Sequence, residues 1–86
     1  MIIDDQELPI PDKLLLTLHN NCIVRPEIAT SVEEISNLIN LTLDNTLGIL
    51  KNHEERGYLK SYIDQMGIKR YYLTSLGIIK VCSSFT

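Results

Sequence analysis

Two helix starts and two helix stops lie close together in the middle of this chain, and they constrain its fold more than any other feature. Ser31 and Glu34 have the spacing of a capping box, in which the serine side chain accepts from the amide of Glu34 and the glutamate side chain reaches back to the amide of Ser31. Asn40 tolerates the left-handed conformation that ends a helix tightly. Thr42 can cap a second helix, for which Gly57 is a natural stop. The sequence therefore predicts two helices joined by a very short turn.

After the second of these helices the pattern changes from helical to alternating. Residues 58–63 and 68–73 are rich in aromatic and β-branched side chains, which favour strands. Residues 64–67, Asp-Gln-Met-Gly, have the composition of a tight turn, with glycine where a positive φ is expected. These segments predict a β-hairpin. Thr74 can then cap a last short helix that continues through Cys82.

The residues before the capping box predict one more helix and an irregular connector. The helix is expected to start at Pro11 or Asp12, because proline suits a first helical turn, and to end near Asn20. Residues 22–30 form the connector, in which the pair Ile23-Val24 could make a short edge strand.

The length of 86 residues suits a single domain. We expect residues 1–10 to be an N-terminal arm and residues 11–86 to form one domain, mainly α with a small β-hairpin, of the α+β class. No apolar stretch approaches the roughly 20 residues that cross a bilayer, and the N-terminus is acidic where a secretory signal is basic. We therefore expect a cytoplasmic protein that does not bind membranes.

The patterns on which catalysis and metal binding depend are missing from this sequence. It has no phosphate-cradling glycine loop, no nucleophile elbow, and no cysteine and histidine spacing that fits a metal. Cys22 and Cys82 lie far apart, and reduced thiols explain them, with a bridge between two subunits through Cys82 as the alternative. Capping and solvent exposure explain the acidic pairs Glu33-Glu34 and Glu54-Glu55. We expect no enzyme, no cofactor and no metal.

The net charge of −3 counts against a nucleic-acid partner, but the charge is unevenly spread. Residues 1–12 contain four acids and no base, whereas residues 51–86 contain six bases and three acids. Phosphate binding depends on local positive potential more than on the total. The acidic end can therefore point away from a DNA ligand.

The expected order of three helices, a hairpin and a last helix is the winged helix-turn-helix plan. Residues 31–59, SVEEISNLINLTLDNTLGILKNHEERGYL, resemble without a gap the winged-helix regulators of the MarR, ArsR and PadR type. The matching positions are Ile35, Ser36, Leu41-Thr42, Leu50 and Gly57-Tyr58-Leu59. Residues 69–77 are similar to the passage into the final helix of these families, so the resemblance covers residues 13–82. It implies a transcription regulator, a repressor, from a bacterium, an archaeon or one of their viruses or plasmids.

Two residues depart from the pattern of these families. His53 stands where they usually have leucine, and either a buried, hydrogen-bonded histidine or a pH or metal sensor would explain it. Gly48 lies in the middle of a helix, where it costs about 1 kcal/mol relative to alanine. Close approach to DNA or to a partner, or simple drift, would explain this glycine.

The resemblance assigns the helix of residues 42–52 to the major groove of DNA, which admits one helix. Asn45 and Asn52 can pair with adenine edges, Lys51 with guanine or phosphate, and an exposed leucine with a thymine methyl. The hairpin would follow the phosphate backbone or enter the minor groove, and the helix start at Ser31 suits a phosphate. The predicted DNA-binding residues are Ser31, Thr42, Asp44, Asn45, Gly48, Lys51, Asn52, Lys60, Gln65, Lys69 and Arg70. A merely solvated polar surface is the alternative.

The terminal helices are too apolar for free surface helices, so they are either buried in their own domain or paired with a second copy. In related regulators such helices form a dimer, which we expect here. The predicted homodimer interface consists of Leu14, Leu15, Leu18, Ile78, Ile79, Val81, Cys82 and Phe85. It would place two recognition helices about 34 Å apart, one turn of DNA. A second hypothesis is a winged helix that serves as a protein-interaction module in a replication or transcription assembly.

Overall fold

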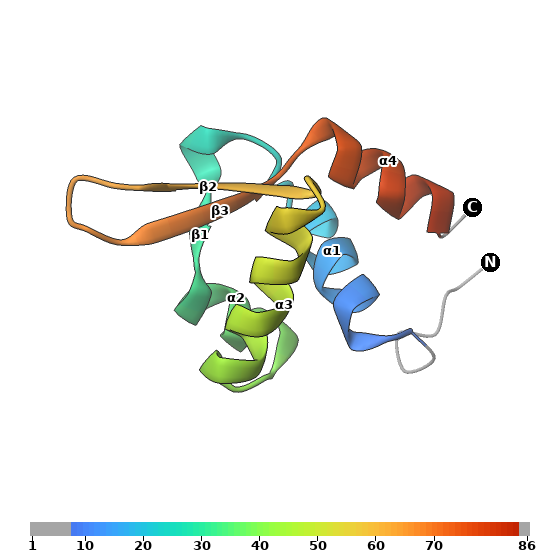
Figure 1. Ribbon diagram of the computed structural model, residues 1–86, viewed down its shortest axis with the longest axis horizontal. Coiled ribbons are helices and arrows are strands. Elements are labelled where there is room, and N and C mark those ends of the chain that lie inside the picture. Colours follow the sequence, from blue (N-terminus) through green and yellow to red (C-terminus); the bar gives the residue numbers. More distant parts are fainter. Residues whose placement is uncertain (1–7, 85–86) are drawn as a thin grey trace.

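The helix-turn-helix expected in the middle of the chain is present in the computed structural model, which describes residues 8–84 (Figure 1). The elements are α1 (Ile10–Asn20), a 3-10 turn (Pro26–Ile28), β1 (Thr30–Ser31), α2 (Val32–Ile39), α3 (Leu43–Glu55), β2 (Leu59–Ile63), β3 (Lys69–Leu73) and α4 (Ser75–Ser84). The hairpin β2–β3 extends to one side of the molecule, and α1 and α4 lie on the other (Figure 1). Most of the predicted arm lies outside the described residues.

The caps predicted from the sequence hold the turn between α2 and α3. The hydroxyl of Thr42 accepts a hydrogen bond from the amide of Asn45 at 3.3 Å. Asn40 ends α2 in the left-handed conformation, with φ 58° and ψ 49°. Leu41, half-buried in the turn, packs against the core and fixes the angle between the two helices. These local bonds explain why three residues are enough to connect α2 to α3.

The capping box at the start of α2 differs in one bond from the prediction. Ser31 accepts from the amide of Glu34 at 3.3 Å, as expected. The carboxylate of Glu34, however, accepts from the hydroxyl of Ser31 at 3.2 Å rather than from its amide. The reason is a second partner, because the same carboxylate oxygen lies 3.7 Å from the guanidinium of Arg70 on β3.

The three strands form an antiparallel sheet in the order β1-β3-β2. The hairpin register pairs Leu59 with Leu73 and Ile63 with Lys69, so the turn spans the predicted residues. The edge strand is not where the sequence placed it. Ile23 and Val24 do not form a strand, although the carbonyl of Ile23 accepts from the amide of Leu73 at 2.8 Å.

The connector bends at two places, which moves the edge strand seven residues further along the chain to β1. Cys22 takes a positive φ of 58° and turns the chain out of α1. Pro26 then starts the 3-10 turn, because its fixed φ suits a first helical position. After that turn the chain is extended again, and Thr30 pairs with Tyr71.

The hydrophobic core lies where α1, α2 and α3 meet the base of the sheet and the side of α4. It consists of Leu14, Leu15, Leu18, Ile23, Ile35, Ile39, Leu50, Leu59, Tyr71, Leu73 and Val81. Each fully buried leucine contributes about 1.5 to 3 kcal/mol relative to an exposed one. Helix α3 is therefore fixed along its buried side, while its opposite side remains available for other contacts.

Four residues of the predicted dimer interface belong to this core. Leu14, Leu15 and Leu18 have exposed fractions of 0%, 1% and 0%, and Val81 is also buried. They leave almost no surface for a second copy, because the core of so small a domain already requires the whole apolar side of α1. Ile79 and Cys82 are exposed and Ile78 is half-buried, whereas Phe85 lies outside the described residues.

Helix α4 starts where the sequence predicted and lies close to the base of the hairpin. The hydroxyl of Thr74 accepts from the amide of Gly77 at 3.0 Å and donates to the carbonyl of Gly57 at 2.6 Å. A methyl group at Gly77 would lie 2.3 Å from the carbonyl oxygen of Tyr58, so only glycine permits this approach. None of the helices in residues 8–84 has the length and apolar character that crossing a membrane requires.

Candidate nucleic-acid interface

Helix α3 presents one continuous exposed side. The predicted outward residues are all exposed in the structure: Leu43, Asp44, Asn45, Leu47, Gly48, Lys51 and Asn52. Thr46, Leu50 and His53 are buried on the other side, at helical spacing. The buried hydroxyl of Thr46 donates to the carbonyl of Thr42 at 2.8 Å, so no polar group of this side chain is left unpaired.

Grooves run along both sides of this exposed surface. One, of about 650 Å³, lies between α3 and the hairpin and is lined by Gly48, Lys51, Glu54 and Lys69 among others. The second, of about 510 Å³, lies between α3 and the start of α1 and includes Asn45 and Asn52. Gly48 lines both grooves, and a methyl group there would meet nothing within 4 Å. Its own chain therefore does not require glycine at this position.

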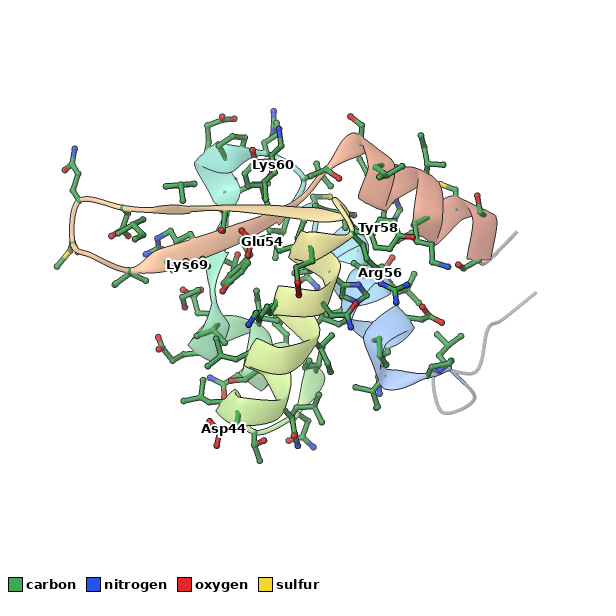
Figure 2. All side chains as sticks on the ribbon, in the orientation of Figure 1. Asp44, Glu54, Arg56, Tyr58, Lys60 and Lys69 are labelled. Atoms are coloured by element: carbon green, nitrogen blue, oxygen red, sulfur yellow. The ribbon has the colours of Figure 1, made fainter. Side chains whose placement is uncertain are left out.

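The three bases predicted for the wing, the hairpin with its turn, do not lie on one surface. Successive side chains of a strand point to opposite faces of the sheet. Lys60 pairs with Tyr72 and Lys69 with Ile63, so the two lysines belong to opposite faces of the hairpin. Figure 2 shows them on opposite sides of the ribbon. The wing therefore does not form the single basic patch that the sequence suggested.

Arg70 is held inside the protein by three acceptors. Its Nε donates to Oδ2 of Asp64 at 2.7 Å, and its Nη1 lies 3.7 Å from Oε1 of Glu34 and donates to the carbonyl of Ala29 at 3.4 Å. The hydrogen bond from Arg70 lowers the pKa of Asp64, while the carboxylate raises the pKa of Arg70. Only 28% of the Arg70 side chain is exposed. This arginine therefore joins the wing to the start of α2.

Asp64 is a residue whose role the sequence analysis missed. Its Oδ1 accepts from the amides of Met66 and Ile68 at 2.8 and 2.9 Å, while Oδ2 binds Arg70. These bonds give the turn of the wing a defined conformation. The signal available in the sequence was an aspartate at the first position of a turn, where its carboxylate commonly binds amides further along. At the tip, Gln65 and Met66 are exposed.

Glu54 connects α3 to both strands of the wing. Its Oε2 accepts from the hydroxyl of Ser61 at 2.5 Å, and its Oε1 lies 3.6 Å from Nζ of Lys69. Lys69 also lies 5.4 Å from the centre of the Tyr71 ring. Solvent exposure was the prediction for both Glu54 and Glu55, and it is correct only for Glu55. The figure shows Glu54 and Lys69 facing one another beneath the hairpin (Figure 2).

Ser31 does not offer a free hydroxyl to a phosphate. The residue is buried, and its hydroxyl is already bound to the amide and the carboxylate of Glu34. The two glutamates of this first turn, Glu33 and Glu34, would also repel a phosphate. The helix start therefore supports the fold, and the prediction of a phosphate contact has no geometric support here.

His53 is a buried, hydrogen-bonded residue, the first of the two explanations given for it. Its Nε2 lies 2.9 Å from the carbonyl oxygen of Pro11. A carbonyl only accepts, so this nitrogen carries the proton and Nδ1 is left without one. Burial lowers the pKa of His53, which favours the neutral form. Within residues 8–84, no three acidic, cysteine or histidine side chains converge as a metal site requires.

The positive charge of the surface is modest. Residues 8–84 contain eight bases and eight acids, so their formal charge is zero. In this part of the chain Lys51 and Lys60 form no ion pair, and Lys51 is the base on the exposed side of α3. Both cysteines are free and exposed.

The architecture was compared with known proteins. No protein-family model matches the sequence, and no curated protein matches it. Among solved structures it is similar to MepR, a transcription regulator of the Staphylococcus aureus multidrug efflux pump MepA, with a TM-score of 0.74 and 20% identity over 86% of this chain and 52% of MepR. The chain therefore spans about half the length of MepR.

Two further solved structures show the same architecture. For MepR in complex with DNA, the TM-score is 0.74 and the identity 18%, over 93% of this chain and 63% of MepR. For a DNA-binding TubR fragment from Clostridium botulinum, the TM-score is 0.76 and the identity 22%, over 99% of this chain and 100% of the fragment. The fold is thus the winged helix-turn-helix, as the sequence predicted, with four helices and a three-stranded antiparallel sheet within residues 8–84.

Proposed function

We propose that this chain binds duplex DNA as a sequence-specific transcription regulator, a repressor, with α3 in the major groove and the wing beside it. The observation that carries the proposal is the exposed side of α3, which is fixed from behind by the core and contains Asn45, Lys51 and Asn52. The fold that it shares with MepR in complex with DNA supports the same role.

The side chains of α3 are suited to reading base edges. Asparagine forms two bonds with adenine, lysine donates to guanine, and aspartate accepts from the amino group of cytosine. Asn45 and Asp44 lie in the first turn, which enters the groove most deeply in helix-turn-helix proteins. Leu43 and Leu47 are exposed and can contact thymine methyl groups. Gly48, which has no side chain, lets the backbone approach the DNA closely, and Thr42 caps the end of α3 that enters the groove.

The phosphate contacts of the wing come first from its exposed tip at Gln65. Lys60 belongs to the face of the hairpin opposite to Lys69 and α3, and Lys69 and Arg70 are bound to carboxylates in the free protein. Affinity for phosphate should therefore be lower than in winged helices with a basic wing. Sequence readout by α3 then carries a larger share of the binding.

We further propose that the protein acts as a homodimer. Ile79 and Leu76 are largely exposed on α4 and lie three residues apart, on one side of the helix. Two copies joined through α4 would bind two half-sites, which are about 34 Å apart in helix-turn-helix dimers. The exposed Cys82 lies on the same helix, where a bridge between subunits would require an oxidising setting.

Fluorescence anisotropy with a labelled random duplex over a series of salt concentrations tests DNA binding, followed by selection of bound sequences from a random pool. The slope of log affinity against log salt should equal about −0.9 for each phosphate contacted. Asn45→Ala should change the selected sequence, whereas Lys69→Ala should weaken binding to all sequences. No binding to random or selected duplex at low salt would contradict the proposal.

A protein-interaction module is the second candidate, and one observation favours it. The exposed side of α3 carries Leu43 and Leu47 but one base, Lys51, and residues 8–84 have no net positive charge. Leucines at a surface with low charge are also typical of protein contacts. The same anisotropy measurement separates the two functions, because this module would bind no duplex at any salt concentration.

A further inference from the structure

Glu54 lies in the last turn of α3, within the groove between that helix and the wing. Its two carboxylate oxygens have different partners, one on each strand of the hairpin. Oε2 accepts from Ser61 on β2, while Oε1 lies 3.6 Å from Nζ of Lys69 on β3. The same groove is lined by Gly48 and Lys51, which we assign to the DNA-binding side of α3. Glu54 is therefore an acid inside the proposed DNA interface.

The two paired bases of the wing differ in their freedom to change partner. Arg70 is 28% exposed and is shared among Asp64, Glu34 and a backbone carbonyl, so its release would leave several groups unpaired. Lys69 is 50% exposed and its ammonium has one carboxylate partner. An exposed ion pair of this kind is weak and easily exchanged. Lys69 is thus the wing base that can move from a carboxylate to a phosphate.

We infer that Glu54 is a positioning residue that competes with the DNA backbone for Lys69. The inference rests on the proposed DNA binding. In the free protein, the carboxylate neutralises Lys69 and holds the wing against α3 through Ser61. A phosphate must displace this carboxylate before it gains the lysine. Any duplex meets this cost, and only a sequence that also bonds to the side chains of α3 offsets it. Because every duplex meets the same cost, Glu54 lowers the affinity for random and for selected DNA by the same factor.

The decisive variant is Glu54→Gln, because the amide oxygen of glutamine still accepts from Ser61 while the negative charge facing Lys69 is removed. Glu55→Gln is the matched control: Glu55 is the neighbouring exposed acid of α3, and it forms no ion pair within residues 8–84. Both variants change the net charge by the same amount. Affinity for random and for selected duplex is measured for each by anisotropy over a salt series.

For Glu54→Gln we expect affinity for random duplex to rise about two- to fivefold, the range that a released surface ion pair permits. The salt slope should become steeper by about 0.9, which corresponds to one additional phosphate contact. The ratio of specific to random affinity should stay unchanged, because the cost that is removed is common to both complexes. For Glu55→Gln we expect a smaller rise and an unchanged slope. Adding Lys69→Ala to Glu54→Gln should remove both the gain in affinity and the change in slope, as a double-mutant cycle shows.

Equal effects of the two glutamine variants, or a gain that survives Lys69→Ala, would overturn the role of Glu54 and leave DNA binding intact. A folded wild type and Glu54→Gln variant that both fail to bind any duplex would instead overturn the proposed function, and this inference with it. If Glu54→Gln binds random duplex while the wild type does not, the inference holds. Glu54 then competes with phosphate more strongly than the energy of an exposed ion pair would predict.

Discussion

Gly77 is the residue at which the structure tolerates the least change. A methyl group there would lie 2.3 Å from the backbone oxygen of Tyr58 and 2.6 Å from a methyl carbon of Leu73. A backbone atom cannot move aside as the end of a side chain can. The contact lets α4 lie against the base of the hairpin, so this single position decides how the last helix joins the domain.

Gly77→Ala should therefore lower the free energy of unfolding by about 1 to 3 kcal/mol, the usual cost of overpacking. Gly48→Ala is the matched control, since a methyl group there meets nothing within 4 Å and alanine favours the helix by about 1 kcal/mol. Urea unfolding followed by circular dichroism measures both. Equal effects of the two substitutions would contradict the close contact at Gly77.

His53 makes the stability depend on pH in a defined direction. Burial lowers its pKa in the folded protein, the bond to Pro11 and the nearby Asp12 oppose this, and Arg56 and Lys80 add to it. Below the ordinary pKa of about 6.5 the unfolded chain binds a proton that the folded protein does not. The contribution of neutral His53 is thus fully present above that pH and is lost as the pH falls.

We expect the free energy of unfolding to decrease when the pH is lowered from about 7.5 to about 5.5, and His53→Leu to remove most of this decrease. Leucine suits the buried site. Urea unfolding at several pH values provides the comparison. The same pH dependence in the leucine variant would show that other groups cause it.

The helix caps, whose partners lie within four positions, could be predicted from the sequence, whereas the contacts between distant residues could not. Thr42 caps α3 and Asn40 ends α2 through bonds to their immediate neighbours. The roles of Glu54 and Gly77 depend on Ser61, Lys69 and Tyr58, which approach them only in the folded chain. A single sequence contains no local signal for such contacts.

Among the elements, the wing depends most on one side chain. Asp64 binds the amides of Met66 and Ile68 and the guanidinium of Arg70, and Arg70 in turn reaches Glu34 at the start of α2. One carboxylate therefore determines both the shape of the turn and its link to the helix-turn-helix. Because these bonds lower the pKa of Asp64, they persist well below neutral pH and weaken only when the carboxyl is protonated.

Asp64→Ala should loosen the wing and leave the helices intact. The amides of Met66 and Ile68 lose their acceptor, so their hydrogen exchange should become much faster, while the exchange of α3 amides should change little. Asp44→Ala, at an exposed acid of α3, serves as the control. Unchanged exchange in the turn would mean that the hairpin alone defines its shape.

Element types were predictable where the pattern repeats over several residues, as in α2, α3 and the two long strands. The edge strand was not, since β1 has only two residues and exists because Thr30 and Ser31 meet β3. Ile23 and Val24 have a stronger intrinsic preference for a strand, but the left-handed Cys22 directs them differently. The place of Thr30 and Ser31 beside β3 therefore decided the edge strand, rather than the higher strand propensity of Ile23 and Val24.

For the molecule as a whole, the largest difference from the sequence prediction concerns the predicted dimer interface. The buried leucines of α1 belong to the core. The proposed contact between two copies is therefore the exposed side of α4, with Leu76 and Ile79. A domain of this size has few apolar side chains, and nearly all of its leucines must form its own core rather than an interface with a second copy. The sequence could show that the terminal helices are apolar but not which neighbour covers each side.

Ile79→Lys should convert the proposed dimer to a monomer, because a charged side chain would be buried at the contact without a partner. Ile63→Lys makes the same substitution at another exposed isoleucine, on the wing, and should leave the mass unchanged. Sedimentation equilibrium measures both. A monomeric wild type, or a dimer that survives Ile79→Lys, would exclude α4 as the contact.

Ser31 is both the last residue of β1 and the cap of α2, so the sheet and the helix-turn-helix share a residue. Opening the short β1–β3 pair would also release the first turn of α2. The two regions should then open as one cooperative unit, in which the amide of Glu34 and the amides of β1 exchange at a common rate. A displacement of the wing that separates β1 from β3 would therefore also open the first turn of α2, without any rearrangement of the hydrophobic core.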